Sequence, residues 1–296
     1  MSPRPLQVVL YALLCLIWGS TWLVIKVGYG DLGPFTVAAI RFAIAGLVLV
    51  PVVPVMGARW PSGRAEWGVV AFVGVVLFAG DYGLIYWGEQ FIDSGLTAVL
   101  FATLPLVTVL FAHRYLPGDQ ITPRKLTGTL LAFLGVAALF VDHLRLDVSA
   151  AGPMLAILAS TVCAAAAAVV SKRHGAHLHA AALNAPAMIV GSVVLLAAAL
   201  VAGERLDLPR DAATWSAILY LAIPGSVVTF LIYFSLLRTW TVTSLSFISV
   251  FTPAVALFLG FLFLDERPTM WTGVGAVMVL AGVALAVTNA GTGRHP

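Results

Sequence analysis

Two stretches of the chain have one pattern: GLTAVLFATLPLVTVLFAHRYL at Gly95–Leu116 and TSLSFISVFTPAVALFLGFLFL at Thr243–Leu264. Each is a long apolar run with a proline near its middle, Pro105 in the first and Pro253 in the second. The prolines lie 148 residues apart, which is half of the 296-residue chain. Internal similarity at a fixed offset in an apolar chain indicates a transporter scaffold built from two related halves.

The similarity continues beyond the two runs. Each run leads into a short polar turn and then into a glycine-rich apolar segment. Gly128 and Gly135 in the first segment correspond to Gly275 and Gly282 in the second, at an offset of 147. We therefore predict two homologous five-helix repeats, residues 1–148 and 149–296.

The composition excludes a water-soluble protein. Hydrophobic residues make up 61% of the chain and charged residues only 10%, whereas a soluble domain has about 25% charged residues. Apolar runs of about 20 residues recur along the whole length, which is typical of transmembrane helices and not of a barrel. We therefore predict an all-α integral membrane protein in which the lipid bilayer surrounds the helices.

Ten transmembrane helices are predicted, and none of the loops has room for a soluble catalytic or nucleotide-binding domain. The spans are expected at roughly residues 6–28, 35–54, 65–88, 94–112, 124–142, 150–170, 181–202, 213–236, 242–264 and 269–288.

The distribution of positive charge predicts the orientation. With the N-terminus in the cytoplasm, ten of the 16 Lys and Arg residues fall on the cytoplasmic side, four fall outside, and Lys26 and Arg41 lie within helices. This excess places both chain ends in the cytoplasm. Because each half has an odd number of helices, the second half must be inverted relative to the first. In inverted repeats the substrate site lies near the membrane midplane, between the halves.

Three features of the sequence resemble a known family. They are LIWGSTWLVIK at Leu16–Lys26, the arginine of AAIRFAIAG at Arg41, and the proline pattern that occurs in both halves. Together they resemble the drug/metabolite transporter superfamily, and within it the ten-helix EamA type. The resemblance spans the whole chain. It implies a secondary carrier, and the bacterial members include exporters of amino acids and related metabolites.

Lys26, Arg41 and Asp81 are the charged residues within the predicted spans. At 1.5 Å per residue, all three lie in the outer half of the membrane. A buried charge there is costly unless it is paired or hydrated. One interpretation is a polar wall of the transport path, in which Arg41 or Lys26 attracts a substrate carboxylate. The other is a structural ion pair that joins the first three helices.

Aromatic residues recur at helical spacing. Trp18 lies near the middle of the first helix, and Ser20 beside it adds a hydroxyl group, so both are candidates to line a cavity. Tyr82 and Tyr86 share one helix face, and Tyr233 is the repeat counterpart of Tyr86. Two related tyrosines on opposite sides of a central site could form paired gates. Packing or anchoring at the membrane interface is the alternative.

Three prolines are predicted to kink helices: Pro105, Pro224 and Pro253. Each removes a helical hydrogen bond and leaves a carbonyl group without its partner. In a membrane such carbonyls need other partners, which hydroxyl groups, water or a polar ligand can supply. Thr103 and Ser249 lie close to two of these prolines, so we predict that they line the path. Kinks that serve only helix packing are the alternative.

The preferred function is a secondary transporter that exports amino acids or related small metabolites across the bacterial inner membrane by alternating access. The alternatives are a proton-coupled exporter of cationic drugs, in which Asp81 would carry the proton, and a passive facilitator of small metabolites. No enzyme, cofactor, metal site or nucleic-acid partner is expected. The sequence leaves the oligomeric state open and is compatible with a monomer.

Overall fold

The computed structural model describes residues 5–30, 32–116, 127–128, 130–138, 148–267 and 269–287. Within these residues the chain is helical between its loops and contains no strand. The elements are α1 (Pro5–Val27), α2 (Pro34–Val55), α3 (Gly63–Phe72), η1 (Val73–Asp81), α4 (Tyr82–Glu89), α5 (Ser94–Phe101), α6 (Leu104–Tyr115), η2 (Val148–Ala150), α8 (Ala151–His174), α9 (Ala180–Val201), α10 (Ala212–Ala222), η3 (Ile223–Val228), α11 (Thr229–Thr239), α12 (Val242–Ser246), α13 (Ile248–Leu264) and α14 (Met270–Val287).

Eight of the ten predicted spans are confirmed as helices long and apolar enough to cross a membrane. Some consist of consecutive elements, such as α3–η1–α4 and α10–η3–α11. The last predicted span forms the shorter apolar helix α14. In the predicted span 124–142, residues 127–128 and 130–138 are helical, and the rest lies outside the described residues.

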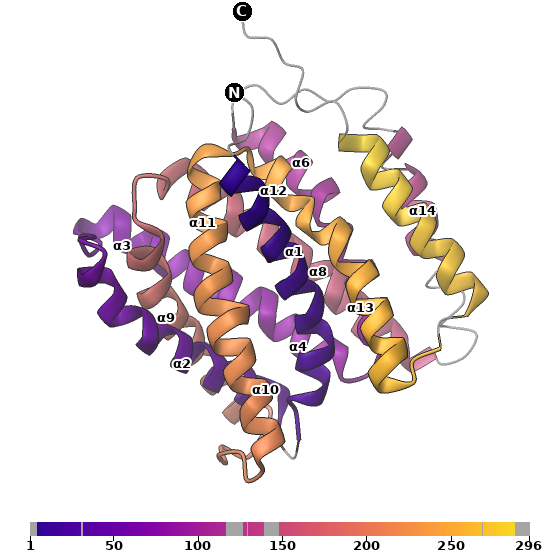
Figure 1. Cartoon of the computed structure of the whole chain (residues 1–296), viewed down its shortest axis with the longest axis horizontal. Coiled ribbons are helices and arrows are strands. Elements are labelled where there is room, and N and C mark those ends of the chain that lie inside the picture. The colour runs from indigo at the N-terminus through magenta and orange to yellow at the C-terminus, as the bar shows by residue number, and fades with distance from the viewer. Residues whose placement is uncertain are drawn as a thin grey trace, which may run out of the picture.

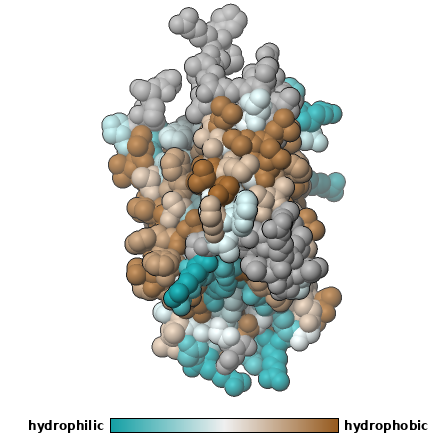
Figure 2. Space-filling view, turned by 90° about the vertical axis from the view of Figure 1, so that its right-hand side faces the viewer, coloured by the Kyte–Doolittle hydropathy of each residue, from teal (hydrophilic) through white to brown (hydrophobic). Residues whose placement is uncertain are grey.

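The helices form one bundle in which α1 begins and α14 ends on the same side, at the top of Figure 1. The face that carries α14 is hydrophobic over its middle and upper parts, and hydrophilic residues gather at its lower end (Figure 2). At that lower end Asp211 caps α10, because its carboxylate accepts hydrogen bonds from the Thr214 N–H and hydroxyl group at 2.7 Å each. Both bonds stabilise the ionised carboxylate, the bond from the backbone N–H more than the one from the hydroxyl group. They therefore hold the pKa of the Asp211 carboxyl below its usual value.

Two of the spanning helices contain a π-helical segment at related positions, η1 in the first half and η3 in the second. In η3 the cause is visible in the sequence, because Pro224 lacks a backbone N–H. The Thr229 N–H donates to the Pro224 carbonyl five residues back, and the Gly225 carbonyl accepts from a side chain of another helix. Such π segments are rare and are common at functional sites.

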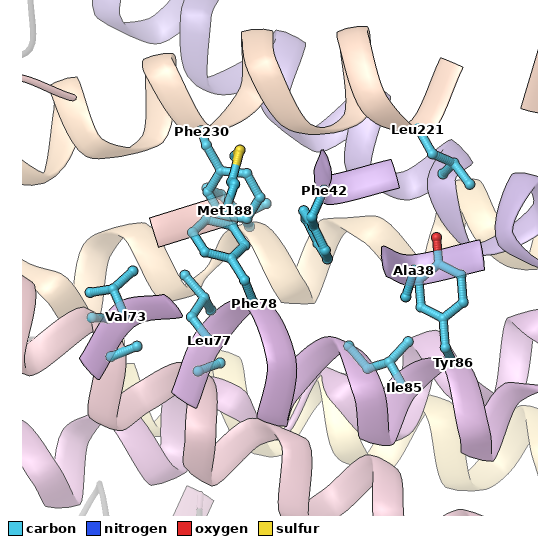
Figure 3. Close-up of a cluster of buried hydrophobic side chains, with 14 of the residues drawn as sticks. Ala38, Phe42, Val73, Leu77, Phe78, Ile85, Tyr86, Met188, Leu221 and Phe230 are labelled. Atoms are coloured by element: carbon cyan, nitrogen blue, oxygen red, sulfur yellow. The ribbon is translucent and has the colours of Figure 1, made fainter. Parts of the chain in front are cut away.

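Aromatic side chains fill the contact between η1, α2 and α11. Phe78 packs against Phe42 and Phe230 with ring centroids 5.0 and 4.9 Å apart, and Met188 of α9 lies next to them (Figure 3). Phe42 and Phe78 are fully buried. These side chains pack η1 against α2, α9 and α11, and so help to fix the frame that holds the polar residues described below.

The glycines predicted from the repeat form a close and reciprocal helix contact. A Cβ atom on Gly135 would lie 2.8 Å from the Gly275 carbonyl of α14. A Cβ atom on Gly282 would lie 2.6 Å from the Gly128 carbonyl. Gly275 is the repeat counterpart of Gly128, and Gly282 is that of Gly135. The two contacts are therefore equivalent when the repeats are exchanged. Such reciprocity is the pattern that a two-fold axis produces.

We expect Gly282→Ala to lower the melting temperature of the purified protein, because the added methyl group meets backbone atoms of the facing helix that cannot move aside. Overpacking of this kind typically costs about 1–3 kcal/mol. Gly273→Ala is the matched control in α14, since a Cβ atom there meets nothing within 4 Å. Equal melting temperatures for both variants, measured in detergent, would contradict the close contact.

Candidate functional site

A cavity lies between helices of the first and second halves of the chain, and its empty space, counted together with open solvent, is about 870 Å³. Its walls come from α1, η1, α4, α5 and α6 of the first half and from α8, α11, α12 and α13 of the second half. Its lining reaches Val242 in the first turn of α12, at the end of the bundle where α1 begins. The cavity lining therefore runs from the end that carries the start of the chain as far as Ile25, in the last turn of α1.

The cavity brings together five of the residues predicted to line a path. These are Trp18, Asp81, Tyr82, Ser249 and Tyr233. They come from α1, η1, α4, α13 and α11. Residues widely separated in the sequence thus meet in one space, which is what a site between two halves requires.

Aromatic rings form much of the cavity wall. The indole of Trp18 lies 5.4 Å from the ring of Phe230 and 5.5 Å from that of Tyr233, measured between centroids. Trp22 and Phe101 extend the wall with centroids 5.4 Å apart. A wall of this kind suits the apolar part of a small molecule.

Hydroxyl groups are the commonest polar groups of the wall, and several donate their hydrogens within their own helices. Ser249 donates to the Ser246 carbonyl at 2.8 Å, and Ser246 to the Thr243 carbonyl at 2.8 Å. Thr21 donates to the Trp18 carbonyl at 2.7 Å. A hydroxyl oxygen that has donated its hydrogen still has lone pairs. These side chains therefore offer hydrogen-bond acceptors to the cavity.

Asp81 is the one charged side chain among the described residues that line this cavity. It is 2% exposed, and its Oδ1 atom is buried without a hydrogen-bond partner within the described part of the protein. Asp81 is the last residue of the π segment η1. A buried carboxyl oxygen without a partner, in a residue of the cavity wall, is a candidate to bind a ligand.

Arg41 lies beside the cavity and does not line it. Its guanidinium group is fully buried and donates to the Ser226 hydroxyl at 2.9 Å, the Tyr86 hydroxyl at 3.2 Å and the Gly225 carbonyl at 3.1 Å. The group also stacks on Tyr82, with 4.8 Å between the Cζ atom and the ring centroid. Its charge is thus held by neutral oxygens and an aromatic ring, and each of its three nitrogens donates one hydrogen bond.

No salt bridge joins Lys26, Arg41 and Asp81 within the described residues, and the predicted structural ion pair stays a prediction. Among the described residues the Arg41 nitrogens bond to neutral oxygens and form no salt bridge with a carboxylate. The Lys26 amine donates to the Ile92 carbonyl at 2.6 Å and lies 3.8 Å from Asp93 and 3.9 Å from Glu266. The three residues were predicted to lie at a similar depth in the membrane. Their side chains diverge, because Lys26 turns towards the loop that precedes α5 and Arg41 turns towards η3.

Two glutamates cap helices at the end of the bundle opposite to the start of α1. Glu204 accepts hydrogen bonds from the backbone N–H groups of Phe35 and Thr36, at 3.2 and 2.8 Å, where α2 begins. Glu266 accepts from the N–H groups of Ser94 and Gly95, at 2.9 and 3.2 Å, where α5 begins. A carboxylate at a helix N-terminus satisfies free N–H groups and the helix dipole.

The same end is closed by further contacts across helices. Tyr86 is fully buried, and besides accepting from Arg41 it accepts a hydrogen bond from the Tyr29 hydroxyl to its carbonyl at 2.7 Å. Tyr86 and Tyr233 therefore lie in different surroundings, one in the packed layer and the other in the cavity. Their roles as gates stay a prediction.

The other two predicted path residues, Ser20 and Thr103, are not among the cavity-lining residues. The Ser20 hydroxyl lies 2.7 Å from the Tyr220 hydroxyl of α10, in a helix contact. Thr103 donates to the Leu100 carbonyl at 2.8 Å in the break between α5 and α6.

The prolines take three different places. Pro105 lies at the start of α6, immediately after that break, and Pro224 lies in η3. Pro253 lies inside α13, which continues through it. The carbonyl that Pro253 frees belongs to Ser249, and it accepts the Thr252 hydroxyl at 3.3 Å. A hydroxyl group thus satisfies a proline-freed carbonyl, as the sequence led us to expect.

Sequence reasoning missed Ser226 and Glu266. Ser226 follows the Pro224–Gly225 pair, and a polar residue beside a proline in an apolar helix was a usable signal. Glu266 lies in the polar turn after Leu264, where the sequence offered no indication of the distant helix that it caps.

Comparisons with known proteins agree with this architecture. The model of the EamA-like transporter family matches residues 6–141 and, separately, residues 152–288. A crystal structure aligns with a TM-score of 0.71 and 18% sequence identity, over 96% of this chain and 98% of the other.

Several relatives are described as transporters. The uncharacterized inner membrane transporter YedA of Escherichia coli (strain K12) is 31% identical over 86% of this chain and 82% of its own length. The uncharacterized transporter YoaV of Bacillus subtilis (strain 168) is 27% identical over 90% and 92%. A probable terminal-alkyne amino-acid exporter of Streptantibioticus cattleyicolor is 27% identical over 90% and 89%.

We expect Arg41→Lys to destabilise the protein, although it keeps the charge. A lysine ammonium group cannot reach three oxygens on η3 and α4 in the geometry of a planar guanidinium group. Each lost hydrogen bond to a charged group costs about 1.5–3 kcal/mol. The melting temperature in detergent should fall by several degrees, while Arg205→Lys at the exposed surface should leave it unchanged. No difference between the two variants would refute the structural role of Arg41.

Proposed function

We propose that this chain, which belongs to the EamA-like transporter family, is a secondary transporter that exports amino acids or related small metabolites. It would work across the bacterial inner membrane by alternating access. The relative described as an amino-acid exporter supports the substrate class, and the inner membrane relative supports the location.

The observation that carries the proposal is a difference between the two ends of the bundle. The cavity lies between the two halves of the chain and extends to the end where α1 begins. At the other end of the bundle Arg41, Tyr86 and the glutamate caps hold the helices together. A carrier that exposes its site to one side at a time requires this asymmetry, and a continuous pore does not.

Two inverted five-helix repeats are part of the proposal. The reciprocal glycine contacts, the paired π segments and the separate family matches to both halves support them. The repeats give a simple account of the motion: one half rocks against the other around the cavity. With both chain ends in the cytoplasm, as the charge distribution favours, the cavity mouth faces the cytoplasm and can load a substrate for export.

A proton-coupled exporter of cations is the second candidate. One observation favours it: Asp81 is the only carboxylate among the residues that line this cavity. A single buried carboxyl group could bind either a proton or a cation, and such competition would couple the two movements.

Transport into proteoliposomes tests the proposal. We expect uptake of a labelled amino acid, drawn from a panel, to accelerate when the vesicles are preloaded with the same unlabelled compound. This acceleration requires a binding site that returns to the outer side of the vesicle with unlabelled substrate bound. A carrier has such a site and a passive path lacks it. Repeating the assay with and without a proton gradient separates coupled from uncoupled transport. Uptake that never exceeds equilibration and never responds to preloading would leave only the facilitator.

A cavity-blocking variant supplies the control for that assay. Ser249→Trp places an indole in the cavity and should abolish uptake. Ser216→Trp places the same side chain on the exposed face of α10 and should leave uptake intact. Equal uptake by both variants would show that the substrate does not pass through this cavity.

The gate roles of Tyr86 and Tyr233 have their own test. The variants Tyr86→Cys and Tyr233→Cys are made singly in a background without Cys15 and Cys163, and a small polar thiol reagent labels the new thiol. Because Tyr233 lines the cavity and Tyr86 is packed, we expect the thiol at position 233 to react and the thiol at position 86 to be protected in the absence of substrate. Saturating substrate should change the two labelling rates in opposite directions. Rates that are low and unaffected at both positions would rule out paired gates.

A further inference from the structure

The charged groups in the cavity wall bear on the class of substrate. This inference rests on the transporter function proposed above. The described residues that line the cavity include one carboxylate and no Lys or Arg side chain. Arg41 or Lys26 was the sequence-based candidate to bind a substrate carboxylate. Neither is among the described residues that line the cavity, and both donate hydrogen bonds elsewhere.

We propose that the cavity selects its substrate by an ammonium group, and that Asp81 binds this group. The Asp81 Oδ1 atom is buried in a residue that lines the cavity, and it has no hydrogen-bond partner among the described residues. A primary ammonium group brings three donors and a positive charge. It satisfies the free oxygen and offsets the cost of a carboxylate in an apolar bundle, which amounts to several kcal/mol when the charge has no partner.

Arg41 does not remove the need for such a partner. Its guanidinium group stacks against the Tyr82 ring and uses its three nitrogens on Ser226, Tyr86 and Gly225. No salt bridge joins Arg41 to Asp81 in the part of the chain that the structure describes. Glu89, the other buried carboxylate of this crossing helix, is outside the cavity lining.

The rest of the wall suits the same ligand. Ser246 and Ser249 have donated their hydroxyl hydrogens to helix carbonyls, so their oxygens accept hydrogen bonds from the ligand. Trp18, Phe230 and Tyr233 surround the cavity with aromatic faces, which attract cations and pack on apolar groups. Within the described residues the indole N–H of Trp22 is buried without a partner, and it can donate to an uncharged or carboxylate oxygen of the same ligand. Amines and amino acids with an apolar side chain both meet these conditions.

The test uses three compounds that share one skeleton: 2-phenylethylamine, phenylalanine and 3-phenylpropionate. The first has only the ammonium group, the second has both charged groups, and the third has only the carboxylate. The full-length protein is purified in detergent, and its thermal stabilisation is titrated with each compound, since a ligand of the folded state raises the melting temperature. We expect stabilisation by 2-phenylethylamine and phenylalanine, and none by 3-phenylpropionate at equal concentration.

Asp81→Asn should weaken the apparent affinity for both amines by about 30-fold or more, because a buried charge partner is lost. Glu89→Gln is the matched control: it removes a buried carboxylate from the same crossing helix outside the cavity and should keep the preference for amines. If Asp81 only balances the charge of Arg41, Asp81→Asn lowers the melting temperature without ligand and leaves the order of the three compounds unchanged, which overturns the proposal.

The unmodified protein alone also decides the question, should Asp81→Asn fail to fold. Stabilisation by 3-phenylpropionate that equals or exceeds that by 2-phenylethylamine overturns the ammonium site, and so does the absence of stabilisation by either amine at millimolar concentration. The transporter function is tested by a separate experiment. Uptake of any compound that accelerates on preloading and is abolished by Ser249→Trp would uphold it even after the ammonium site is lost.

Discussion

The buried guanidinium group of Arg41 determines how the two halves of this protein meet. A charge inside an apolar bundle must find oxygen acceptors, and regular helices offer few, because their carbonyls are already bonded. The π segment η3 resolves this problem. Its Gly225 carbonyl accepts from both Arg41 and, at 3.4 Å, the indole of Trp18. The guanidinium group therefore requires the free carbonyl of η3, and that carbonyl requires a donor. Their hydrogen bond joins α2 to η3.

Three contacts at this end of the bundle share one feature: each sets a charged side chain against neutral groups of the other half, although Glu266 also lies 3.9 Å from Lys26. Arg41 of the first half bonds to a carbonyl of the second, and Glu204 and Glu266 of the second half bond to N–H groups of the first. Water can replace a neutral partner at modest net cost, because a typical intramolecular hydrogen bond contributes only about 0.5–1.5 kcal/mol and one to a charged group about 1.5–3. Contacts of this strength are what the proposed alternating access requires at a closed end.

The helices and their internal similarity could be predicted from the sequence, because both depend on local hydrophobicity and on a fixed offset. The partners of the polar residues could not. The rise per residue indicated the depth of Lys26, Arg41 and Asp81 in the membrane, but depth does not give the direction in which a side chain points. The rotation of each helix about its axis depends on packing, here of Phe42, Phe78 and Phe230. The π segments add a further change of register that no periodic pattern in the sequence encodes.

Asp81 shows why a site can be recognised by what remains unsatisfied. The same bundle provides partners for Arg41, for the carbonyl freed by Pro253 and for the helix ends at α2 and α5. Folding alone would favour a similar partner for Asp81, or an apolar residue in its place, since an unpaired buried carboxyl oxygen lowers stability. Proteins break their local rules mainly at functional sites and compensate for the cost elsewhere. The aromatic packing around η1 offsets this cost, and Asp81 remains among the residues that line the cavity.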